Sequence, residues 1–139
     1  MKILYQAEAT ATGGRTGSVA SNDGRVSLTL DTPKELGGNG GAGTNPEQLF
    51  ASGYAACFLG ALKFVAGQRK IAIGEPKVTA QVGIGSRDDG AGFGLAITLR
   101  VAFDGIDTDT AQSLIEAADV VCPYSALARN GAAVDLALA

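Results

Sequence analysis

The chain has 139 residues, 46% of them hydrophobic and 18% charged, with a formal net charge of −3, so it is long enough to bury a core as one domain over residues 1–139. Its eleven lysines and arginines are scattered, which argues against nucleic acid or a membrane surface as a partner. It has no histidine, which removes the usual zinc ligand and the usual general base, and we expect no metal site.

The N-terminal segment "MKILYQAEA" is too briefly apolar to resemble a secretory leader, because Gln6 and Glu8 interrupt it. The sequence therefore predicts a cytoplasmic protein. In that reducing compartment a bond between the only two cysteines, Cys57 and Cys122, would be transient, catalytic or redox-sensing.

The loop "TGGRTG" places Arg15 between glycines, so no bulky neighbour hinders its guanidinium from reaching into a site. The alternative is an ordinary solvated loop arginine. Further on, "NDG" at residues 22–24 is followed by Val26, Leu28 and Leu30, which alternate with polar residues. This combination predicts a β-hairpin.

A glycine-rich run, "GGNGGAG", occupies residues 37–43 just ahead of a predicted helix. A phosphate-binding function is weakly supported, because no Gly-Lys-Ser/Thr follows and the preceding segment does not read as a buried strand. We expect a mobile or tightly turning loop.

The stretch "TNPEQLFASGYAACFLGALKFVAG" predicts a long buried helix. Asn45 is a candidate N-cap, Pro46 suits the first helical position, and Gln48 completes a variant capping box. The most apolar window, residues 49–62, is shorter than the roughly 20 residues of a membrane span, and Lys63 ends it. These features favour the core helix of a soluble protein.

Cys57 lies on this helix with Gly53 and Gly60 one turn away on either side. An interior glycine costs about 1 kcal/mol relative to alanine, so we expect something to approach this face closely. Either another helix crosses tightly and Cys57 is inert, or a ligand reaches a reactive thiol. Glu47, in the first turn, is by itself no more than a favourable charge at the positive end of the helix dipole.

Alternating apolar residues over 78–84 and 95–103 flank the turn "SRDDGAG" and predict a second β-hairpin. Cap candidates in "DTDT", residues 107–110, then predict a helix that presents apolar residues on one face as far as Cys122.

Pro123 forces a break after Cys122, because the residue before a proline disfavours helical geometry. The final segment "VDLAL", residues 134–138, alternates like a short strand. Antiparallel hairpins with helices packed on one side predict an α+β fold.

Two of these segments, "GGNGGAGTNPEQLFASGYAACFLGAL" and "VCPYSALAR", resemble the cysteine motifs of the organic hydroperoxide resistance proteins, within the OsmC-like superfamily. "TGGRTG" matches the arginine loop of that family, and the order of predicted elements agrees over essentially the whole chain. Ser52 and Ala126 depart from the expected pattern, which usually has alanine and asparagine there. The resemblance implies antiparallel sheets packed on a long central cysteine-bearing helix, in an intertwined homodimer.

The resemblance further implies a cysteine-based peroxidase of the oxidative stress response, which reduces alkyl and fatty-acid hydroperoxides to alcohols. At the matching positions, Cys57 is the peroxidatic cysteine and Cys122 the resolving one. Arg15 activates the thiolate, and Glu47 holds Arg15. No resident cofactor is implied, because an external dithiol, such as dihydrolipoamide or a lipoylated protein, reopens the disulfide.

Phe50, Tyr54 and Phe64 lie near the cysteine face of the predicted helix and suit an organic hydroperoxide better than hydrogen peroxide. Glu47 and Cys57 are ten residues apart, which is about 15 Å along one straight helix. Either the helix bends sharply or the carboxylate comes from another chain. Which subunit supplies Arg15 and Glu47 to each cysteine stays open.

Two other functions stay open as well. One is a non-catalytic member of the superfamily that binds small apolar ligands, with both cysteines as packing residues. The other is a redox sensor that passes its oxidation to a partner, although the sequence has no tail that marks a docking segment.

Overall fold

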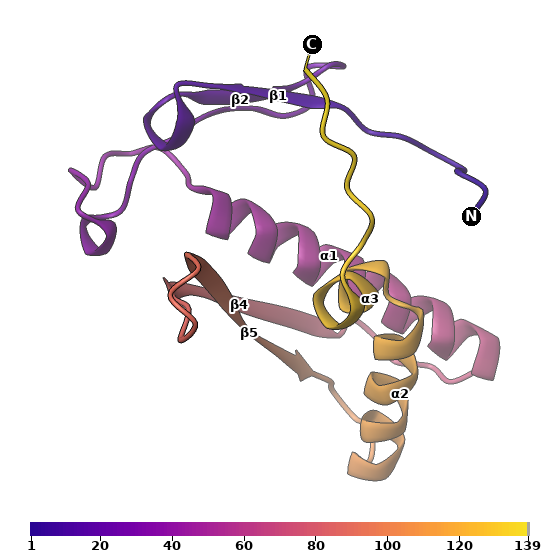
Figure 1. The fold of residues 1–139 in the computed structure, drawn as a ribbon. Helices are drawn as coiled ribbons and strands as arrows, with labels where there is room; N and C mark the ends of the chain where they lie inside the picture. The colour runs from indigo at the N-terminus through magenta and orange to yellow at the C-terminus, as the bar shows by residue number, and fades with distance from the viewer. Residues whose placement is uncertain (139) are drawn as a thin grey trace. The chain divides into compact units, whose positions relative to one another are not determined.

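The computed structural model describes residues 1–138 (Figure 1). Residue 139, the end of the predicted single domain, lies outside the described residues. The chain forms two compact units, residues 1–49 and residues 50 onward, and whether they act as one domain stays a prediction. Helix α1, Pro46–Arg69, begins in the first unit and continues into the second.

The first unit holds a three-stranded antiparallel sheet in the order β1-β2-β3. Its elements before α1 are β1 (Ala9–Thr12), the 3-10 turn η1 (Gly14–Thr16), β2 (Ser18–Ser21), β3 (Ser27–Thr29) and the 3-10 turn η2 (Lys34–Leu36). The hairpin predicted around "NDG" is confirmed, with Val19 opposite Leu28 and a left-handed Gly24 in the turn. The sequence did not single out β1, whose short run of alanine and threonine has all four residues exposed.

The glycine-rich segment, residues 37–43, is a tightly turning loop, as predicted. Gly37 and Gly40 adopt left-handed conformations, and the amide of Gly43 donates a hydrogen bond to the carboxylate of Asp31. A side chain at Gly43 would collide with that carboxylate. The glycines therefore let the backbone wrap around Asp31.

The start of α1 also follows the prediction. The Gln48 amide donates to Oδ1 of Asn45 over 2.9 Å, so Asn45 caps one of the free N–H groups of the first turn. Pro46 occupies the first helical position, where a missing N–H costs nothing. The Gln48 side chain accepts a hydrogen bond from the Thr44 hydroxyl.

The second unit packs an antiparallel hairpin and two short helices against α1 (Figure 1). The remaining elements are β4 (Lys77–Ser86), β5 (Phe93–Ala102), α2 (Thr108–Val121) and α3 (Pro123–Asn130). The hairpin is confirmed with Val78 opposite Val101, and both side chains pack against the core. Asp107 caps α2 by accepting the amide of Thr110.

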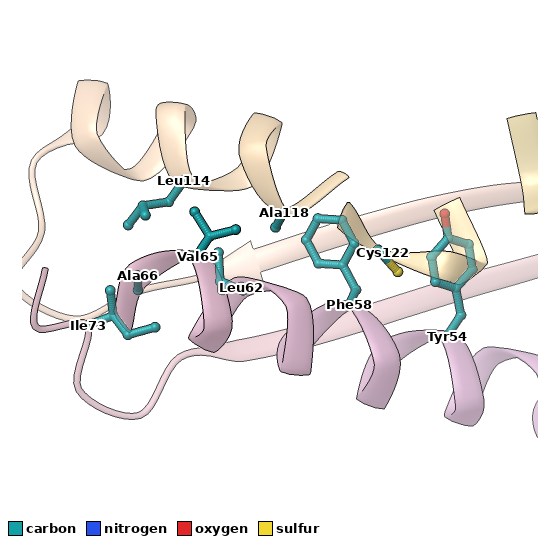
Figure 2. Close-up of a cluster of buried hydrophobic side chains, with 9 residues drawn as sticks. All are labelled: Tyr54, Phe58, Leu62, Val65, Ala66, Ile73, Leu114, Ala118 and Cys122. Carbon is teal, nitrogen blue, oxygen red and sulfur yellow. The ribbon is translucent and has the colours of Figure 1, made fainter. Parts of the chain in front are cut away.

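The core of the second unit is a row of apolar side chains between α1 and α2 (Figure 2). Phe58 and Leu62 of α1 and Leu114 of α2 are almost completely excluded from water. Fully burying one side chain of this size stabilises the folded state by roughly 1.5–3 kcal/mol. This row fixes α2, and hence the residue at its end, against the cysteine-bearing helix.

One expectation for the C-terminal region was wrong, and one element was not expected. The chain breaks at Cys122 as predicted, but Pro123 also occupies the first position of a further helix, α3. The strand expected at residues 134–138 is not formed, and Val134 and Leu136 are 75% and 93% exposed. An alternating segment becomes a strand only when another strand pairs with it, and none does within the described residues.

Helix α1 is the one helix within residues 1–138 whose length and composition would suit a membrane span, with a mean hydropathy of 1.6 over 18 residues. The core helix of a soluble protein passes the same test, so this property alone is weak support for a span. Its buried side chains form the core described above, and α1 is a core helix of the second unit.

The fold is α+β, as predicted, with a small antiparallel sheet in each unit and a long helix that carries Cys57.

Candidate functional site

Arg15 sits at the centre of a short 3-10 turn, Gly14–Thr16. Gly13 and Gly14 have positive φ angles of 71° and 59°, and a side chain at Gly17 would meet the Thr12 carbonyl oxygen at 1.8 Å. The glycines around Arg15 are therefore required by the backbone of the turn, whereas the sequence had suggested only that they leave the guanidinium unhindered.

The Arg15 guanidinium forms a two-pronged ion pair with the Glu47 carboxylate. The two hydrogen bonds measure 2.9 Å and 2.6 Å, and the side chains are 36% and 13% exposed. These hydrogen bonds raise the pKa of Arg15 and lower the pKa of Glu47. The planar guanidinium matches a carboxylate in this geometry, so Glu47 fixes the orientation of Arg15.

The face of α1 around Cys57 is approached by an aromatic ring. A methyl group at Gly53 would lie 3.1–3.2 Å from the hydroxyl and ring edge of Tyr124, whereas nothing in the chain comes within 4 Å of one at Gly60. The close approach expected at Gly53 is confirmed. Gly60 has no such neighbour within residues 1–138, and its presence is not explained by packing in this chain.

Cys122 lies at the joint between two helices. It is the C-cap of α2 and the N-cap of α3, with the extended angles φ −72° and ψ 119°. Its amide donates to the Ala118 carbonyl, and its own carbonyl accepts the amide of Ala126. The side chain is fully buried, so the position of the sulfur is set by both helices.

The two sulfur atoms lie 3.6 Å apart, and the Cys122 thiol donates toward Cys57. Both cysteines are free thiols; Cys57 is partly exposed and Cys122 is buried. A disulfide needs the two sulfur atoms about 2.05 Å apart, so the sulfur atoms must approach by less than about 2 Å for the bond to form. Residues separated by 65 positions in the sequence thus form a single dithiol site.

Burial raises the pKa of the Cys57 thiol, and the nearby Cys122 thiol acts in the same direction. The backbone N–H of Tyr124, in the first turn of α3, opposes this by hydrogen bonding to the Cys57 sulfur. The groups of the described chain that act on Cys57 include no cation. A nearby cation or further hydrogen bonds to the sulfur would lower this pKa.

Three aromatic rings gather beside the dithiol. Phe50 stacks on Tyr124 with 5.8 Å between ring centroids, and Tyr54 contacts both rings at 5.7–5.9 Å. Of the predicted substrate-binding residues, Phe50 and Tyr54 thus lie together, whereas Phe64 is 57% exposed and outside this cluster. Whether any of them contacts substrate stays a prediction.

Tyr124 and Ser125 were missed in the sequence. Tyr124 belongs to the aromatic cluster, and Ser125 is fully buried with its hydroxyl 2.9 Å from that of Tyr54. The available signal was Pro123, which marks the first position of a helix as well as the end of one. That signal would have placed both residues in the first turn of α3, beside Cys122.

A cleft of about 470 Å³ is lined by Tyr54 and Phe58. Its walls also include three strand residues, Leu95, Ile97 and Leu99, with the Asp119–Arg129 ion pair at its edge. Neither cysteine lines it. Among residues 1–138, no cluster of cysteine, aspartate and glutamate side chains is arranged to hold a metal ion.

The combination of a long cysteine-bearing helix, small antiparallel sheets and a buried second cysteine defines a recognisable class of protein. A family model described as OsmC-like protein matches residues 37–137. The chain is 52% identical over 139 residues to the organic hydroperoxide resistance protein of Xanthomonas axonopodis pv. citri, with 99% of this chain and 96% of that protein covered. It therefore belongs to the OsmC-like family, among the organic hydroperoxide resistance proteins.

Solved structures agree with this assignment. An organic hydroperoxide resistance protein from Legionella pneumophila superposes with a TM-score of 0.88 at 42% identity, covering 94% of this chain and 93% of that one. One from Elizabethkingia anophelis gives the same TM-score at 49% identity, covering 94% and 92%. The OsmC-like fold expected from the sequence is thereby confirmed.

Proposed function

We propose that this protein is a thiol peroxidase that reduces organic hydroperoxides to alcohols in the cytoplasm, as part of an oxidative stress response. The 3.6 Å between the Cys57 and Cys122 sulfur atoms is the observation that carries the proposal. One thiol is partly exposed and the other is buried behind it, which suits an attacking and a resolving cysteine. The names of the relatives support the class of substrate.

In the oxidative step, the Cys57 thiolate attacks the distal oxygen of the hydroperoxide. The O–O bond breaks, Cys57 becomes a sulfenic acid, and the departing alkoxide takes up a proton to become the alcohol. Arg15 supplies the positive charge that stabilises the thiolate and then the alkoxide. Glu47 holds the guanidinium in the required orientation through its two hydrogen bonds.

In the resolving step, the Cys122 thiolate attacks the Cys57 sulfur. The S–O bond breaks, a disulfide forms, and the hydroxide leaves as water after protonation. An external dithiol, for which we propose a lipoyl group on a carrier protein, then reduces the disulfide and restores both thiols. No resident cofactor takes part.

We propose that the working form is a homodimer in which Arg15 and Glu47, from the same subunit or from its partner, serve each Cys57. An organic hydroperoxide would lie against the apolar rings of Phe50 and Tyr54, with Phe64 as a further contact. Mixed dimers of Glu47→Ala and Cys57→Ser chains test which subunit supplies the charge. Activity returns only if the carboxylate and the thiol of one site come from different chains.

The proposed activity is tested by peroxide consumption with cumene hydroperoxide or hydrogen peroxide, and with dihydrolipoamide or thioredoxin as donor. We expect turnover with the organic peroxide and dihydrolipoamide, and a loss of roughly 1,000-fold or more in Cys57→Ser. Cys122→Ser should still consume one equivalent of peroxide and accumulate a sulfenic acid. Equal turnover by Cys57→Ser would overturn the proposal.

The cleft beside Tyr54 and Phe58 favours a second candidate, a non-catalytic binder of small apolar ligands. Mass spectrometry after limiting cumene hydroperoxide separates the two functions. The peroxidase loses two hydrogen atoms as its disulfide forms, whereas the binder remains a dithiol.

A further inference from the structure

A pair of buried hydroxyl groups joins the cysteine-bearing helix to α3. The hydroxyls of Tyr54 and Ser125 lie 2.9 Å apart, Ser125 is completely buried, and Tyr54 is only 4% exposed. A buried hydroxyl without a partner is strongly destabilising, so each of these groups depends on the other. This hydrogen bond therefore ties the first turn of α3 to α1.

The hydrogen bond runs beside the contact between the two sulfur atoms. Tyr54 precedes Cys57 by three residues and lies on the same side of α1, while Ser125 follows Cys122 by three residues in the first turn of α3. Figure 2 shows Tyr54 and Cys122 next to each other at one end of the row of core side chains. Two non-covalent contacts thus connect the same two segments: the hydrogen bond between the hydroxyls and the contact between the thiols.

The segment that carries Cys122 is also held by backbone hydrogen bonds within α2 and α3 and by the Tyr124 N–H, which bonds to the Cys57 sulfur. Cys122 has non-helical, extended angles, and its side chain does not cap α3. The Tyr124 ring packs on Phe50 and above Gly53, but an aromatic contact permits sliding in a way that a directional hydrogen bond does not. Among the described contacts that join the start of α3 to α1, the Tyr54–Ser125 contact is the hydrogen bond between two side-chain oxygen atoms.

We propose that Tyr54 and Ser125 are positioning residues for the resolving step: their hydrogen bond holds α3 so that the Cys122 sulfur is aimed at Cys57. This inference rests on the proposed peroxidase function. Ring closure within one chain is fast when the reacting atoms are held near attack distance, and a misplacement of about 1 Å can cost roughly 100-fold in rate. The hydrogen bond acts on disulfide formation, so its loss in Ser125→Ala leaves the first oxidation of Cys57 unchanged.

Ring closure can be followed without peroxide by using Ellman's reagent. The Cys57 thiolate attacks the reagent and releases one coloured thionitrobenzoate, leaving a mixed disulfide on the more exposed cysteine. The Cys122 thiolate then attacks the Cys57 sulfur, the bond to the nitrobenzoate sulfur breaks, and a second thionitrobenzoate leaves. Stopped-flow absorbance gives the rate of each release.

We expect the second release to slow about tenfold in Ser125→Ala and in Tyr54→Phe, while the first release in Ser125→Ala stays within about twofold of wild type. The double variant Tyr54→Phe/Ser125→Ala removes both hydroxyls and so leaves none unpaired. It should regain thermal stability yet close its ring as slowly as either single variant.

The control is Ile73→Val, which removes one buried methylene at the opposite end of the same core (Figure 2). It should lower stability without slowing the second release. Wild-type closure rates in the single variants, recovery of the rate in the double variant, or an equal slowing in Ile73→Val would each overturn the inference.

Peroxide then separates this inference from the function on which it rests. With cumene hydroperoxide, Ser125→Ala should form sulfenic acid at the wild-type rate and allow more of it to be trapped by dimedone before the disulfide forms. If wild type forms no sulfenic acid, the peroxidase proposal fails, and the Ellman rates still decide whether the hydroxyl pair aims Cys122.

Discussion

The two units of the chain differ in the chemical groups that they bring together. In residues 1–49, the Arg15 guanidinium is fully matched by Glu47, and that unit holds no cysteine. In residues 50 onward, two thiols meet at 3.6 Å, but burial raises the pKa of Cys57 and no described neighbour supplies a cation. The first unit therefore holds an oriented cation and no thiol, whereas the second holds two thiols in contact.

The largest effect should come from removing the charge. In Arg15→Ala, we expect the alkylation of Cys57 by iodoacetamide to titrate above about pH 8.5, the ordinary thiol pKa, because burial then acts unopposed by a cation. Turnover of an alkyl hydroperoxide should fall roughly 100-fold. Wild type should titrate at a lower pH than Arg15→Ala.

Arg15→Lys is the matched control, because it keeps the charge but loses the planar fork that Glu47 holds. For Arg15→Lys, both the pH midpoint of Cys57 alkylation and the rate of hydroperoxide turnover should lie between those of wild type and Arg15→Ala. An unchanged alkylation midpoint in Arg15→Ala would break the comparison, since the charge of the first unit would then not act on the thiol of the second.

A smaller effect should distinguish the two glycines of α1. Gly60→Ala should raise the free energy of unfolding by about 1 kcal/mol, because alanine favours the helix and the site is open in this chain. Gly53→Ala should lower it by about 1 kcal/mol, because the new methyl group presses on the Tyr124 ring, which Phe50 and Tyr54 hold in place.

Urea denaturation of both variants gives these values. If Gly60→Ala is instead destabilising, a surface from outside the chain packs there, as a second copy in a homodimer would. If Gly53→Ala is stabilising, the Tyr124 ring moves freely and the close approach has no energetic consequence.

The smallest effect concerns the ion pair of the first unit. The hydrogen bonds from Arg15 lower the pKa of Glu47 below its unfolded value of about 4.3. The resulting stabilisation is present above that pH and is lost as the pH falls through the lower folded value. Because the Arg15 side chain is 36% exposed, solvent screening limits it to about 1 kcal/mol.

Thermal unfolding of wild type and Glu47→Gln between pH 3 and pH 7 measures this contribution. The two curves should differ near pH 7 and converge as the pH falls from about 4.3 through the lowered folded pKa of Glu47. Glu35→Gln, at an exposed position of the same unit, should follow wild type throughout. A difference that persists in acid would mean that Glu47 acts through packing and not through its charge.

Much of the fold was accessible from the sequence because its signals are local. The cap at Asn45, the proline after it and the alternation on both sides of "NDG" each depend on neighbouring residues, and the structure confirms all of them. The strand expected at residues 134–138 failed for the opposite reason. Alternating apolar and polar residues show which face of a strand would be buried, but they do not show whether another strand is available to pair with it.

The candidate site was only partly accessible. The resemblance singled out Cys57 and Cys122, but a separation of 65 positions in the sequence does not give the distance between their sulfur atoms. The contact between the two sulfur atoms depends on how α2 packs along α1. Ser125 could not be recognised as a partner of Tyr54, because a serine in a helical first turn is ordinary until burial makes its hydroxyl dependent on another group.

Cys122 is shared by the hydrogen-bond ladders of two consecutive helices, since its amide closes the last turn of α2 and its carbonyl opens the first turn of α3. A bond formed at its sulfur therefore acts on the one residue that ends α2 and begins α3.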